Sequence, residues 1–78
     1  MHVLVVDDHP VVLNGTAAML QQKTNWTIWQ TTKSEEVAQL VQQYRIDLCL
    51  IDIQMPHLSG TDVAKWLRTH EPTVKIVF

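Results

Sequence analysis

The chain has 78 residues, of which 46% are hydrophobic and 18% are charged, so it suits one small globular domain (residues 1–78) rather than a disordered segment. Its formal net charge is −2 and its six lysines and arginines are scattered, which argues against direct nucleic-acid binding by this segment. The single cysteine excludes an internal disulfide and no apolar run is long enough to cross a bilayer, so we expect a cytoplasmic protein without membrane contact.

The first half of the chain predicts two strands, each followed by a helix. The apolar, β-branched run at 3–6 is typical of a strand buried on both faces of a parallel sheet. Pro10 suits the first turn of a helix over 10–22. One stripe of that helix is expected to be buried: Val12, Thr16, Met19 and Leu20. A β-prone segment at 26–31 predicts the second strand, and Ser34 is expected to cap the second helix.

The second half repeats this alternation. The segment 47–52 predicts a third strand, in which Cys49 is expected to be an inert core thiol. A third helix is expected to begin near 59–61 and to end before Pro72, and the segment 74–78 begins a fourth strand. The buried face of this helix is expected to comprise Val63, Trp66 and Leu67. Strands that alternate with helices in this way predict an α/β fold with a parallel sheet and right-handed crossovers.

Aspartates follow two of the predicted strands. Asp7 and Asp8 come directly after the first strand, and Asp52 ends the third. Functional residues gather at the carboxyl ends of parallel strands, so these three carboxylates converge if the two strands are neighbours. Such a cluster needs a cation, and an all-oxygen ligand set favours Mg²⁺ or a similar hard ion. A carboxylate beside a metal can accept a phosphoryl group, giving an aspartyl phosphate. His9 is interpreted as a loop residue before a proline, with metal ligation as the alternative.

Three motifs in this order, "VLVVDDHP", "LCLIDIQMPHLSG" and "TDVAKWLR", resemble the receiver domain of bacterial two-component response regulators. The resemblance covers the whole chain, and "DDHP" is similar to receivers that precede a helix-turn-helix DNA-binding domain. It implies a flavodoxin-like sheet with strand order 2-1-3-4-5, of which this chain would supply the first four strands. It also implies that Asp7, Asp8 and the backbone carbonyl of Gln54 hold Mg²⁺ and that a sensor histidine kinase phosphorylates Asp52.

The chain departs from the family pattern in its length. The family's Ser/Thr at the end of the fourth strand and its Lys and aromatic residue on the fifth are not matched here, so the chain is interpreted as a truncated receiver. We therefore expect phosphorylation of Asp52 to be slow or undetectable and, through the apolar edge at 74–78, a homodimer or a swapped assembly. The protein is not expected to be an enzyme. Two alternatives stay open. One is a metal-dependent phosphatase with an aspartate nucleophile, although such enzymes place a second aspartate two residues after the first, where this chain has His9. The other is a phosphorylation-independent binding module.

Overall fold

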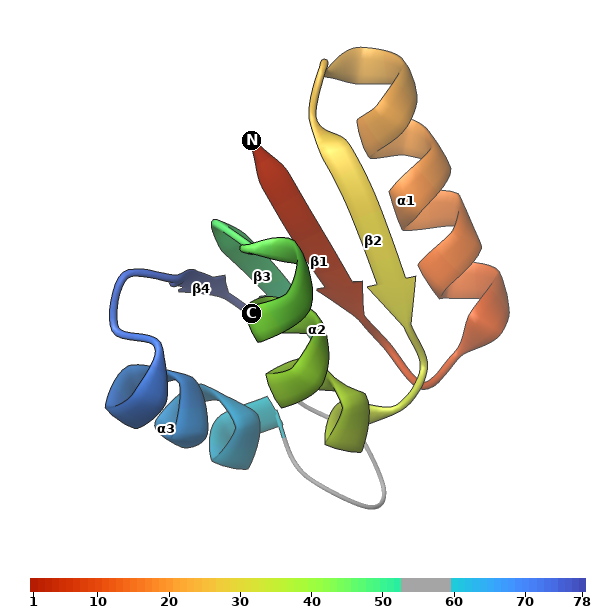
Figure 1. The fold of residues 1–78 in the computed structure, drawn as a ribbon. Coiled ribbons are helices and arrows are strands. Elements are labelled where there is room, and N and C mark those ends of the chain that lie inside the picture. Colours follow the sequence, from red (N-terminus) through yellow and green to blue (C-terminus); the bar gives the residue numbers. More distant parts are fainter. Residues whose placement is uncertain (53–59) are drawn as a thin grey trace.

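The structure is a computed structural model and describes residues 1–52 and 60–78. Four parallel strands form one sheet in the order β2-β1-β3-β4, as the resemblance implied: β1 (His2–Val6), β2 (Thr27–Thr31), β3 (Leu48–Ile51) and β4 (Lys75–Val77). The connecting elements are α1 (Pro10–Lys23), the 3-10 turn η1 (Ser34–Glu36), α2 (Val37–Tyr44) and α3 (Gly60–His70). In Figure 1, α1 lies beside the sheet on the side opposite α2 and α3. None of the described helices is long and apolar enough to cross a membrane.

The central strand β1 is buried on both faces, which explains its unbroken apolar sequence. Successive side chains of a strand point to opposite faces. Val3 and Val5 pack with Leu13 of α1, whereas Leu4 and Val6 join the cluster that includes α2 and α3. None of these four β1 side chains is more than 4% exposed. The sheet therefore has a helical layer on each side, and β1 lies at the centre of both hydrophobic cores.

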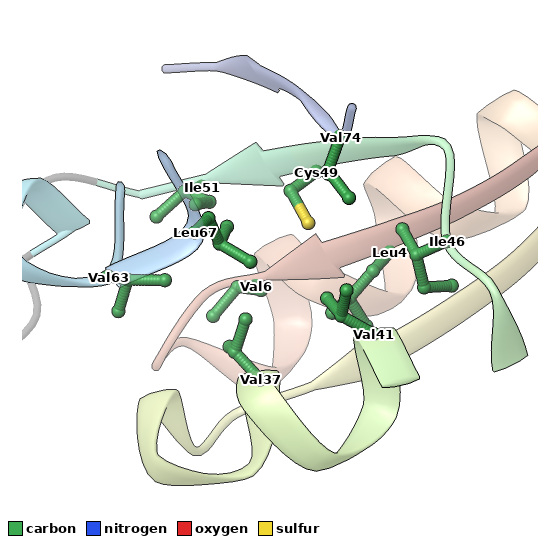
Figure 2. Close-up of a cluster of buried hydrophobic side chains, with 10 residues drawn as sticks. All are labelled: Leu4, Val6, Val37, Val41, Ile46, Cys49, Ile51, Val63, Leu67 and Val74. Atoms are coloured by element: carbon green, nitrogen blue, oxygen red, sulfur yellow. The ribbon is translucent and has the colours of Figure 1, made fainter. Parts of the chain in front are cut away.

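The larger core lies between the sheet and the helices α2 and α3 (Figure 2). Leu67 and Cys49 are both fully buried in it. Burial in this apolar cluster raises the pKa of the Cys49 thiol to about 12, because the thiolate would have to exist without water. Cys49 is therefore a protonated packing residue at neutral pH, as the sequence predicted.

Two local predictions were wrong. The buried residues of α1 are Leu13 and Ala17. Of the predicted stripe, Leu20 is partly buried against the same core, whereas Val12 and Met19 are half exposed. The reason is that apolar side chains surround this helix, so its sequence does not define a single buried stripe. Ser34 also makes no capping hydrogen bond. It is the first residue of η1 and is buried. Glu36, the last residue of η1, accepts a hydrogen bond from Thr31 Oγ1 at 3.0 Å.

Candidate functional site

The pairing of β1 with β3 brings the predicted carboxylates together. Val6 is the register partner of Ile51, so the residues that follow them, Asp7 and Asp52, leave the sheet side by side. The backbone N–H of Asp52 donates to the carbonyl of Val6 at 2.9 Å, which extends the ladder by one bond. On the other side of β1, the N–H of Asp7 donates to the carbonyl of Thr31 at 3.2 Å. Backbone hydrogen bonds thus hold Asp7 and Asp52 where the two strands end.

Four side chains converge at this edge: Asp7, Asp8, His9 and Asp52. Each residue offers one possible ligand atom, an oxygen or a nitrogen, and these four atoms all lie within 4.8 Å of one another. The carboxylates are partly withdrawn from solvent, since the side chains of Asp7, Asp8 and Asp52 are 15%, 24% and 24% exposed. Three partly buried carboxylates this close repel one another, so the site attracts a cation.

The imidazole of His9 lies close to all three carboxylates. Its Nδ1 lies 3.1 Å from Asp7 Oδ1, 2.9 Å from Asp8 Oδ1 and 3.8 Å from Asp52 Oδ2. The hydrogen bond to Asp7 and the negative charge of Asp8 raise the pKa of His9 above its usual 6.5. The interpretation of His9 as a plain loop residue was therefore incomplete. The position of His9 directly after two aspartates was a sequence signal for this contact. The orientation of its ring, however, is known only from the folded turn.

One atom of the cluster indicates that a cation fits. Asp8 Oδ1 is buried and has no hydrogen-bond donor within the described part of the chain. The imidazole Nδ1 of His9 lies near it, but this is a charge contact and does not meet hydrogen-bond geometry. Burying a carboxylate oxygen without a partner is unfavourable. A divalent ion would satisfy this oxygen, and the carboxylate donors suit Mg²⁺.

The remaining predicted ligand, the carbonyl of Gln54, lies outside the described residues, as do Met55 and Pro56. The described part of the site opens onto a hollow of about 380 Å³ on the α1 side of the sheet. Asp7, His9 and Asp52 line it together with apolar side chains of the sheet and α1, among them Val5, Leu50 and Phe78. Asp7 and Asp52 are therefore accessible to a small ligand from that side.

Comparison with known families places this geometry in context. The family model for the response regulator receiver domain matches residues 3–78. Among the curated relatives, the transcriptional activator protein ExaE of Pseudomonas putida is 32% identical over 79 residues, a match that covers 100% of this chain and 37% of ExaE. The chain thus spans little more than a third of that relative's length.

Solved structures agree with the fold. The response regulator TrrA of Thermotoga maritima, in complex with Mg²⁺-BeF, has a TM-score of 0.88 and 32% identity, covering 96% of this chain and 64% of TrrA. RcsB of Salmonella enterica serovar Typhimurium, bound to promoter DNA in the presence of the phosphomimetic BeF3−, has a TM-score of 0.86 and 25% identity. That match covers 97% of this chain and 45% of RcsB.

Proposed function

Since the chain belongs to the response regulator receiver domain family, we propose that Asp52 is its phosphoryl acceptor and that Asp7, Asp8 and Asp52 hold the Mg²⁺ that acceptance requires. The backbone carbonyl of Gln54 is the further ligand in this proposal. The observation that carries it is the β1–β3 register, which sets Asp52 beside the acidic pair at the carboxyl ends of two neighbouring strands. The Mg²⁺-BeF complex of TrrA supports the same reading, because it holds both groups on a related fold.

In this proposal Asp52 acts as a nucleophile. One of its carboxylate oxygens forms a bond to phosphorus while the bond from phosphorus to the donor breaks. With a phosphohistidine of a sensor kinase as donor, the broken bond is P–N, and the leaving imidazole takes up a proton. A bound Mg²⁺ supplies positive charge that offsets the repulsion between the anionic carboxylate and the anionic phosphoryl group. Asp7 and Asp8 contribute by holding that charge close to Asp52.

The test of this function is phosphoryl uptake by the chain itself. Incubation with acetyl phosphate and Mg²⁺ over several hours is expected to add one phosphoryl group, measured by intact mass, and chelation of the metal is expected to prevent it. The added group should be released by hydroxylamine, which cleaves acyl phosphates. A chain that stays unmodified, or is modified equally with EDTA present, contradicts the proposal.

Mg²⁺ alone is expected to stabilise the fold. At about ten times its Kd it adds about 1.4 kcal/mol to the free energy of unfolding, because it binds the folded state only. For a domain of this size that raises Tm by about 5–10 °C. Asp8→Asn should lose most of the shift, since Asp8 presents the unsatisfied oxygen.

Glu71→Gln is the matched control for this measurement. Glu71 follows α3, before β4 begins. It therefore lies near the amino ends of the strands, whereas the aspartates lie at their carboxyl ends. This variant should keep the full shift in Tm. If native chain, Asp8→Asn and Glu71→Gln all respond equally to Mg²⁺, the ion binds elsewhere.

The role assigned to the domain is regulatory rather than enzymatic. Receiver domains are the regulatory domains of response regulators. We propose that this one acts in the cytoplasm and controls transcription through a DNA-binding domain outside the present sequence. The names of ExaE and RcsB support that reading, but the chain covers less than half of either protein. The phosphatase alternative is disfavoured because the position two residues after Asp7 is His9 rather than a second aspartate.

We also propose that the 78-residue chain self-associates through β4, as a homodimer or a swapped assembly. Among the described strands, β4 pairs with β3 alone, and its end is apolar, with Val77 46% and Phe78 61% exposed. Unpaired, apolar edge strands are templates for a second chain. Val77→Lys is expected to shift the chain to monomer in light scattering across a concentration series, whereas Val11→Lys, on exposed α1, should leave the assembly unchanged. A native chain that stays monomeric at high micromolar concentration contradicts this.

A further inference from the structure

The turn that joins β1 to α1 directs the His9 ring into the carboxylate cluster. His9 is the N-cap residue of α1, with an extended backbone (φ −101°, ψ 103°), and Pro10 follows it as the first helical residue. Its backbone N–H donates to Asp7 Oδ1 at 2.9 Å. This bond closes the turn over the aspartate, so that the ring lies beside Asp7 and Asp8 although its side chain is 65% exposed. The placement of the ring is thus built into the backbone of the turn.

The distances from His9 Nδ1 to the three carboxylates are compatible with a shared ion. With bonds of about 2.1 Å, adjacent ligand atoms of an octahedral ion lie about 3.0 Å apart and opposite ones about 4.2 Å apart. His9 Nδ1 lies 3.1 Å and 2.9 Å from the oxygens of Asp7 and Asp8, which are adjacent spacings. The nitrogen lies 3.8 Å from Asp52 Oδ2, between the two values. The four ligand atoms lie within 4.8 Å of one another, so a small contraction of the cluster would bring them to bonding distance of one ion.

An imidazole nitrogen changes which ion such a site prefers. Carboxylate oxygens alone suit Mg²⁺, whereas imidazole suits Zn²⁺, Ni²⁺ and related transition ions. A neutral ring with its proton on Nε2 presents the Nδ1 lone pair to the centre of the cluster. The nitrogen therefore adds affinity for a transition ion and little for Mg²⁺.

We propose that His9 Nδ1 is a fourth protein ligand of this site, so that the chain binds a divalent transition ion more tightly than Mg²⁺. The proposal rests on the proposed function, because it uses the same three carboxylates. It differs in what it assigns to His9, which would tune the choice of ion without accepting the phosphoryl group.

The test compares Co²⁺ with Mg²⁺ at about pH 8, where free imidazole is neutral. We expect Co²⁺ to bind the native chain more tightly than Mg²⁺. His9→Asn should weaken Co²⁺ binding by about tenfold or more, since even losing a residue that only supports a metal ligand costs about that much. The same variant should change Mg²⁺ binding by less than about twofold, because Mg²⁺ takes oxygen ligands. Asn is a good N-cap residue, so α1 should form normally in this variant.

Two further variants make the outcome specific. His70→Asn, at the end of α3, is the matched control and should leave both affinities unchanged, because His70 stacks on Trp66 away from the cluster. Paramagnetically shifted imidazole resonances should appear with Co²⁺ in the native chain and in His70→Asn, but not in His9→Asn.

The inference is overturned if Co²⁺ binding survives His9→Asn, if both ions are weakened equally, or if both bind more tightly, which would make His9 only a competing cation. Asp8→Asn separates this failure from failure of the proposed function. If Asp8→Asn leaves Mg²⁺ binding intact, the carboxylate site itself is wrongly placed.

Discussion

Asp52→Asn is expected to abolish metal-dependent phosphoryl uptake from acetyl phosphate. The carboxylate of Asp52 is the group that bonds to phosphorus, and a neutral amide in its place lacks the nucleophilic oxygen. The backbone N–H of residue 52 still donates to Val6, so the fold should be retained. Intact mass before and after incubation measures the loss, which should be complete within detection.

Controls separate the acceptor from its neighbours. Asp8→Asn and Asp7→Asn should slow uptake, because these residues act through the metal ion, but a modified fraction should remain after long incubation. Asp62→Asn, in the first turn of α3, should match the native chain. Undiminished uptake in Asp52→Asn, or recovery of the phosphoryl group on Asp7 or Asp8 by peptide mapping, would assign the acceptor to another carboxylate.

Leu67→Ala is expected to lower the free energy of unfolding strongly. Leu67 is fully buried between α3 and the sheet, as Figure 2 shows, and truncating such a leucine typically costs about 2–5 kcal/mol. Domains are stable by only about 0.05–0.15 kcal/mol per residue, so the loss is a large share of the total for a small domain. Denaturant unfolding followed by circular dichroism measures it.

Met19→Ala is the matched control for the core substitution. Met19 also lies within a helix, but half of its surface is exposed, and replacing it changes helix propensity by a similar small amount. Its effect on the free energy of unfolding should stay within about 0.5 kcal/mol. If Leu67→Ala and Met19→Ala destabilise equally, α3 does not pack on the sheet as described.

The sequence by itself determined the order of elements and the strands that carry the carboxylates. The runs at β1 and β3 are short and apolar, and that at β1 is rich in β-branched residues, a pattern typical of buried parallel strands. Because parallel strands all end at one edge, Asp7, Asp8 and Asp52 could be expected to meet once β1 and β3 were neighbours. The metal-ligand and acceptor roles given to them stay predictions.

Only the tertiary structure decided which sides of the connecting segments face inward. On α1, apolar residues occur around the whole helix, so docking against the sheet rather than helical periodicity selected Leu13 and Ala17 over Val12 and Met19. The His9 ring is a similar case. Its contact with three carboxylates depends on a hydrogen bond within the turn and on an aspartate 43 positions later in the chain, on a neighbouring strand. Long-range pairing and the docking angle of a helix are properties of the packed molecule, and no local pattern of residues specifies them.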